Sequence, residues 1–151
     1  MLKENLSELF ERDLNKLKNE ISLFREEDDL WKTSGEITNP AGNLCRHLLG
    51  NLNHFIGATL GSTGYIRERD KEFSVRDASR SELIAEIEKT IDAVKMSLNK
   101  LSADDLDKDY PLETNGKIVK TEQELVQILL HFNYHLGQIN YHRRFFQTDE
   151  K

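Results

Sequence analysis

Residues 129–139 read Leu-Leu-His-Phe-Asn-Tyr-His-Leu-Gly-Gln-Ile, and this stretch indicates both the fold class and the chemistry of the chain. Its apolar residues recur at intervals of three and four, which is the pattern of an amphipathic helix. His131 and His135 stand four residues apart, so both imidazoles would lie on one face of that helix. Two imidazoles placed in this way can bind the same divalent metal ion. A third histidine, His47, falls in an earlier helical segment and would complete a set of three nitrogen ligands with an open coordination position.

The rest of the chain contains three further segments with helical spacing, and no strand-like alternation competes with them. The apolar positions predict helices over about 6–31, 40–60, 80–101 and 121–146. Each would be roughly 20 to 26 residues long, or about 30 to 39 Å at about 1.5 Å per residue. Four matched helices predict one all-α domain over residues 1–151. We expect this domain to be a four-helix bundle. Its long loops would allow up-down-down-up connectivity as well as simple up-and-down connectivity.

Local sequence signals mark the ends of these helices. Asn39 before Pro40 predicts a capping residue followed by a proline in the first helical position. Ser79 and Thr121 are each followed three residues later by a glutamate, which is the capping-box pattern. Gly61 is expected to end the second helix.

Two long connections separate the helices. Residues 62–78 are polar and form an unusually long connection for a compact bundle, and long ordered loops are often functional. Residues 102–120 contain Asn115-Gly116, a good signal for a tight turn. We therefore expect a turn there, which allows a short hairpin before the last helix.

Composition and charge exclude several classes of protein. The formal net charge of −6 disfavours general nucleic-acid binding and adsorption to anionic membranes, since both need a basic surface. Cys45 is the only cysteine, so no intrachain disulfide is expected and an oxidising compartment is not implied. No apolar run is long enough for a membrane span, and the first residues lack the apolar core of a signal peptide. We therefore expect a soluble cytoplasmic protein.

Spacing alone leaves the third metal ligand open. His47 and His54 lie seven residues apart on one helix face, so either could accompany the histidine pair of the last helix. His142 lies about 10 Å along the helix axis from His135, too far to bind the same ion, and we expect a structural or supporting role for it. Outer hydrogen-bond partners for the ligands are available on the same stripes, namely Asn51, Gln138, Asn140 and His142.

Other residues give weaker signals. The residue after His131 is Phe132, so the pair is not the HExxH arrangement of metalloproteases. Cys45 fits a core cysteine better than a reactive one. Four arginines could receive an anion near the mouth of the bundle, but nearby acidic residues and the helix C-terminus explain them better, namely Arg67, Arg69, Arg143 and Arg144. Gly137 is expected to allow close helix packing.

Two motifs resemble the DinB/YfiT-like superfamily. Residues 131–139 are similar to its last-helix signature, His-x-x-x-His-x-Gly-Gln, and residues 42–50, Gly-Asn-Leu-Cys-Arg-His-Leu-Leu-Gly, to its second-helix histidine region. The likeness covers essentially the whole chain in helix order, helix length and motif position. The strings at residues 50–57 and 137–144 resemble a subgroup of small bacterial proteins of unknown function.

The resemblance implies a divalent metal ion, Zn²⁺ or Ni²⁺, bound by His47, His131 and His135 in a four-helix bundle that often forms a homodimer. On this basis we prefer His47 to His54 as the third ligand. Leu136 departs from the pattern, because many relatives have arginine before the Gly-Gln pair. A substrate-binding role of that arginine would be absent or reassigned in this chain.

Characterised relatives include metal-dependent transferases and isomerases that use bacillithiol, mycothiol or glutathione. The resemblance therefore implies a metal-dependent enzyme, a thiol-dependent S-transferase or a related activity on a small molecule, with access near Tyr65 and Arg67. Two alternatives stay open. One is a non-catalytic metal-binding or stress-related protein, and the other is a metal-free bundle whose histidines and amides satisfy one another.

Overall fold

Four long helices dominate the computed structural model, which describes residues 1–147. They are α1 (Leu2–Leu23), α2 (Ala41–Leu52), α5 (Arg80–Asn99) and α7 (Thr121–Phe146). A π-helical segment, η2 (Asn53–Ala58), and the short α3 (Thr59–Gly61) prolong α2. Three short elements complete the chain: the 3₁₀ helix η1 (Glu27–Trp31), α4 (Arg69–Ser74) and α6 (Ala103–Asp107). The predicted all-α class is confirmed.

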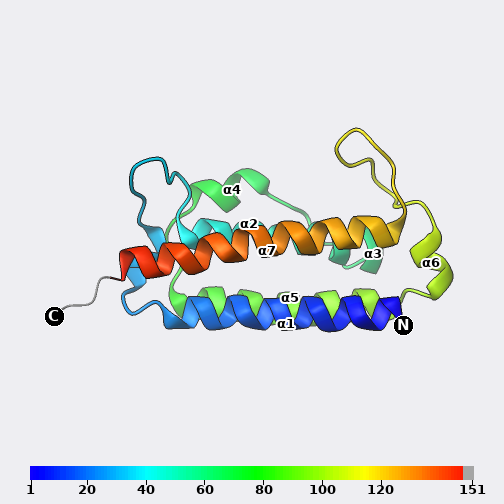
Figure 1. Cartoon of the computed structure of the whole chain (residues 1–151), viewed down its shortest axis with the longest axis horizontal. Helices are drawn as coiled ribbons and strands as arrows, with labels where there is room; N and C mark the ends of the chain where they lie inside the picture. Colours follow the sequence, from blue (N-terminus) through cyan, green and yellow to red (C-terminus); the bar gives the residue numbers. More distant parts are fainter. Residues whose placement is uncertain (148–151) are drawn as a thin grey trace.

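The helices form a bundle in which α1 and α7 run in one direction and α2 and α5 in the other (Figure 1). Helix α1 packs against α5 and α7, and α2 packs against the same two helices. Residues 62–79 run back along the bundle between α3 and α5 and carry α4 over α2 (Figure 1). The connectivity is therefore up-down-down-up, one of the two arrangements that the loop lengths allow.

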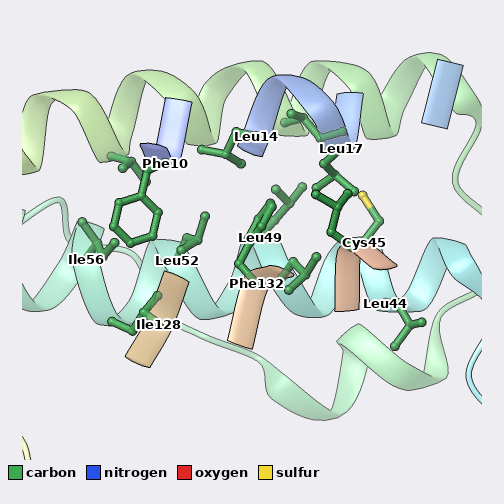
Figure 2. Close-up of a cluster of buried hydrophobic side chains, with 14 of the residues drawn as sticks. Phe10, Leu14, Leu17, Leu44, Cys45, Leu49, Leu52, Ile56, Ile128 and Phe132 are labelled. Carbon is green, nitrogen blue, oxygen red and sulfur yellow. The ribbon is translucent and has the colours of Figure 1, made fainter. Parts of the chain in front are cut away.

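The core forms because each long helix contributes one apolar stripe at three-four spacing. Figure 2 shows Phe10, Leu14 and Leu17 of α1 meeting side chains of α2. Phe132 of α7 is also part of this cluster and is fully buried. The cluster as a whole draws on α1, α2, α5 and α7 and continues into η1 through Leu30.

The first helix is shorter than predicted. It ends at Leu23, because Phe24 adopts an extended conformation, and η1 follows as a separate turn. The Arg80 guanidinium donates hydrogen bonds to the carbonyls of Phe24 and Arg25, so a residue distant in sequence binds the carbonyls at this helix end. The separate η1 turn places Leu30 in the core.

The predicted helix starts have different outcomes. Ser79 caps α5 in a complete capping box with Glu82, as predicted. The prediction for Thr121 is wrong, because its hydroxyl donates instead to the carbonyl of Lys108 at 3.1 Å and Lys120 occupies the cap position. The prediction at Asn39 is shifted by one residue, because Pro40 is the cap and α2 begins at Ala41.

Both long connections contain a short helix that the sequence patterns did not reveal, α4 in the first and α6 in the second. The predicted turn is present, because Asn115 and Gly116 both have positive φ angles, 51° and 75°. Antiparallel bridges join Thr114 to Lys117 and Asp109 to Lys120, but no strand forms within residues 1–147. Within the same residues no helix is long and apolar enough to cross a membrane.

Candidate metal centre

Three histidines from two helices meet at one point between α2 and α7. His47 of α2 and His131 of α7 approach to 3.2 Å between their Nε2 atoms. His135 lies one turn further along α7, and one ring nitrogen from each of the three residues lies within 4.8 Å of the others. The rings of His131 and His135 both stand edge-on to His47 with centroids 5.1 Å away. The structure therefore brings together the three histidines that the sequence motif predicted as ligands.

The protonation states suit a metal site. Burial, reinforced by the neighbouring His135 and His47, lowers the pKa of His131 to about 4. Burial also lowers the pKa of His135. Both rings are therefore neutral at neutral pH, which is the form of imidazole that binds a metal ion.

Two of the rings are oriented by outer hydrogen bonds on Nδ1. Gln138 Oε1 lies 2.7 Å from His135 Nδ1, and Glu72 Oε1 lies 3.1 Å from His47 Nδ1. Since both acceptors are oxygens without a proton, each Nδ1 donates, and Nε2 of the neutral His135 ring keeps its lone pair. The supporting role predicted for Gln138 agrees with this geometry.

The sequence predicted Glu72 only as a partner of the loop arginines and not as part of the site, because it lies in the polar connection 62–78 and no motif includes it. Its carboxylate receives two hydrogen bonds from Arg67, through Nε to Oε2 and Nη2 to Oε1, both at 2.9 Å. Burial alone would raise the pKa of Glu72, but the hydrogen bonds from His47 and Arg67 outweigh it and lower the pKa. A buried carboxylate thus stays ionised beside a metal-ligand candidate.

Gly50 explains how this carboxylate can lie against α2. A Cβ atom at Gly50 would lie 1.9 Å from Oε2 of Glu72, so any larger residue would displace the carboxylate. Asn43, one turn before His47, donates hydrogen bonds to the carbonyls of Glu72 and Val75, each at 2.9 Å. Small and amide residues of α2 therefore hold α4 in place over the histidines.

Several other candidates lie outside the cluster. His54 lies two turns beyond His47, and its ring packs on Phe55 with centroids 4.7 Å apart, so it does not join the three histidines. His142 is buried on α7 but does not reach them. The side chain of Asn140 donates to Glu20 at 2.7 Å instead of supporting a ligand.

The arginines, Cys45 and Gly137 follow simpler explanations. Arg67 is paired with Glu72, and Nε of Arg143 lies 2.8 Å from a carboxylate oxygen of Glu20. Cys45 is fully buried, and burial raises the pKa of its thiol, so the residue belongs to the core. The packing role predicted for Gly137 is wrong, because no described atom lies within 4 Å of a Cβ placed there.

Two cavities reach the cluster from different sides. His135 lines a cavity of about 500 Å³ between α7 and residues 36–39. His131 lines a cavity of about 380 Å³ beside the turn at Asn115. Tyr65, predicted near the access route, lines a third cavity with Glu72 on the far side of the carboxylate. A small molecule in either cavity would therefore lie against a histidine of the cluster.

Comparison with protein families gives one match. Residues 4–151 match the model of the family described as "Protein of unknown function (DUF1572)". No curated protein matches the chain. The match covers nearly the whole chain and includes all three histidines of the cluster.

Proposed function

The chain belongs to the DUF1572 family, whose function is unknown, and we propose that its histidine cluster binds one divalent metal ion as a reactive centre. The ligands are His47, His131 and His135, and the observation that carries the proposal is the convergence of their ring nitrogens within 4.8 Å. Zn²⁺ and Ni²⁺ are among the ions that imidazole ligands suit, and we propose one of these two.

Hydrogen bonding favours a metal ion over mutual satisfaction of the three rings. His47 and His135 use Nδ1 to donate to Glu72 and Gln138, so the metal-binding, neutral form of each ring presents its lone pair on Nε2. A single N–H of His131 can satisfy only one of these two lone pairs. A cation accepts all three nitrogen lone pairs at once, although Nδ1 of His131 has no partner among the described residues.

The chemistry of such a site follows from its three ligands. When bound, the ion supplies a Lewis acid with an open position that can take a small-molecule thiol in its deprotonated form. The chain itself holds the ligands: Glu72 fixes the proton of His47 on Nδ1, and Gln138 does the same for His135. Arg67 helps to keep Glu72 ionised, so the carboxylate can accept the hydrogen bond from His47.

We assign the protein a thiol-dependent transferase activity on a small molecule. Support comes from the open ligand set and the two cavities that reach it. Further support comes from the resemblance of residues 131–139 to the last-helix signature of the DinB/YfiT-like superfamily. Leu136, buried on α7, replaces the arginine of many relatives, so another part of the site binds the substrate.

Metal content of tag-free protein tests the site. We expect about one equivalent of Zn²⁺ or Ni²⁺ per chain by mass spectrometry, lost in the His135→Ala variant. The His54→Ala variant is the matched control, since it removes an imidazole outside the cluster and should keep the metal. Metal-free protein whose melting temperature does not respond to either ion would contradict the proposal.

Thiol binding tests the transferase activity separately. In Co²⁺-substituted protein we expect glutathione to produce a sulfur-to-metal charge-transfer band that is absent in His135→Ala. Full metal occupancy without any change on thiol addition would leave the non-catalytic metal-binding protein as the function.

A further inference from the structure

The cavity beside His135 has walls that suit an organic ligand. It has a volume of about 500 Å³ and lies between the loop at residues 36–39 and the C-terminal half of α7. Tyr134, Tyr141 and Phe145 line it from α7, at positions that share one helix face. Their side chains are 67%, 73% and 59% exposed, so large aromatic surfaces stand in solvent along this wall. Exposed aromatic groups around a cavity are typical of a binding site for an apolar molecule.

His142 lines the same cavity and lacks hydrogen-bond partners. It is 4% exposed, and neither of its ring nitrogens is paired with any atom of residues 1–147. Buried polar groups in folded proteins are nearly always hydrogen-bonded, so an unpaired imidazole in a cavity wall calls for a partner from outside the chain. Burial lowers the pKa of His142, so the ring is neutral and offers one donor and one acceptor.

The charge of the walls limits the class of ligand. Among the described residues that line the cavity, Glu36 is the sole charged side chain, and it is exposed at the loop. No lysine or arginine of the described residues lines the cavity, and the nearby Arg144 stacks on the ring of Tyr141, so in the metal-free chain a carboxylate or phosphate would find no counterion among the lining residues. The walls therefore favour an uncharged molecule over an anion.

The cavity also leads to the histidine cluster. His135 and Gln138 line it on the side of the cluster, and their hydrogen bond of 2.7 Å joins the cavity wall to the candidate ligand set. His142 lies seven residues beyond His135, which corresponds to about 10 Å along the helix. An aromatic molecule of ordinary size can span this distance with one end at each histidine.

We propose that this cavity binds an uncharged aromatic molecule whose hydroxyl or carbonyl group hydrogen-bonds to His142 while its other end lies at His135. As a statement about the substrate of the metal centre, this inference rests on the proposed function. Binding itself uses the aromatic wall and His142, so it does not require the metal ion. The two proposals can therefore fail separately.

Fluorine NMR with 4-fluorophenol and 4-fluorotoluene tests the inference on the full chain, with and without a chelator. We expect 4-fluorophenol to bind saturably in both conditions and more tightly than 4-fluorotoluene. In His142→Phe the ring volume stays and the nitrogens are lost. Its affinity for 4-fluorophenol should fall about tenfold, the effect of one lost hydrogen bond, while its affinity for 4-fluorotoluene stays unchanged.

Further variants make the test independent of any effect of His142 on folding. Tyr141→Ala removes an exposed part of the wall and should weaken both compounds, whereas Tyr65→Ala lies in a different cavity and should change neither. Equal affinities of His142→Phe and the native protein for 4-fluorophenol would overturn the proposal, as would tighter binding of 4-fluorobenzoate. Light scattering of Tyr141→Ala provides a further check. An altered oligomeric state together with unchanged binding of the compounds would also overturn the proposal, since the aromatic wall would then be a protein interface.

Discussion

The two sides of the bundle use charge in opposite ways. Between α1 and α5, ion pairs lie at the surface: Lys18 and Glu88 approach to 2.9 Å with side chains 37% and 55% exposed. Against α2, on the side of the histidine cluster, Arg67 and the α4 residue Glu72 approach to the same 2.9 Å, but their side chains are only 12% and 7% exposed. The first pair is solvated and stabilises little, whereas the second has lost most of its water and depends on the partners that replace it.

Histidine distribution follows the same division. All five histidines of the chain lie on α2, its extension η2 and α7, and none lies on α1 or α5. Buried polar groups occur on both sides, since Asp13 of α1 and Ser97 of α5 are also fully buried, but the histidines are confined to the α2–α7 side. Buried polar groups cost free energy unless they are hydrogen-bonded, so His47, Arg67 and Glu72 depend on the contacts that they make with one another.

The largest difference between the two sides should appear when one acidic partner of each ion pair is removed. We expect Glu72→Ala to lower the free energy of unfolding by about 3 to 5 kcal/mol, because Arg67 would stay buried without a counter-charge. Glu88→Ala should lower it by less than about 1 kcal/mol, since its partner is solvated. Urea denaturation of both variants measures the difference, and equal losses would show that the burial of the Arg67–Glu72 pair has no energetic consequence.

A smaller effect should come from two glycines that differ in their surroundings. Gly50→Ala would drive a methyl group into the Glu72 carboxylate, so we expect a loss of about 1 to 3 kcal/mol in stability and weaker metal binding. Gly137→Ala meets no described atom within 4 Å and removes a flexible residue from a helix. It should therefore stabilise the protein by up to about 1 kcal/mol.

Urea denaturation and metal titration of the two glycine variants provide the measurement. A Gly50→Ala protein with native stability and native metal affinity would contradict the role of Gly50 in seating Glu72. A strongly destabilised Gly137→Ala protein would show that a contact outside the described chain covers that position.

The smallest expected effect is a pH dependence confined to the α2–α7 side. Burial lowers the pKa of His142 in the folded chain, so the unfolded chain binds more protons as the pH falls below about 6.5. The stability of the unmodified protein should therefore decrease between pH 7 and pH 5.5 more steeply than the stability of the His142→Phe variant. Thermal melts in the presence of a chelator measure this pH dependence. His131 and His135 are present in both proteins, so their contribution drops out of the comparison. Identical slopes would mean that His142 is not desolvated.

Spacing rules predicted most of the bundle and half of the site. The stripes of the long helices, the cap at Ser79 and the turn at Asn115 all depend on residues within a few positions of one another, and each is present. The resemblance of residues 131–139 and 42–50 to the superfamily motifs also selected the three histidines that the fold brings together. Metal binding, the homodimer, the cytoplasmic location and the transferase activity stay predictions.

Errors occurred where a distant residue decides a local structure. Arg80 donates hydrogen bonds to the carbonyls at the end of α1. The hydroxyl of Thr121, which was expected to cap α7, donates instead to the carbonyl of Lys108. Neither partner can be identified from the residues next to the helix end. The predicted closeness of Gly137 to another helix failed for the same reason, because a small residue indicates room for a neighbour without supplying one.

The sequence by itself determined the helices and the face of α7 that carries His131 and His135, because helical periodicity is a local property. Only the tertiary structure decided which polar residue reaches His47. Glu72 lies 25 residues away in a connection without a motif, and it arrives through the close approach of α4 at Gly50. The same holds for His142, whose unpaired nitrogens depend on which side chains the fold leaves out of reach. Spacing fixes directions along one helix, whereas burial and hydrogen-bond partners depend on every element that packs against it.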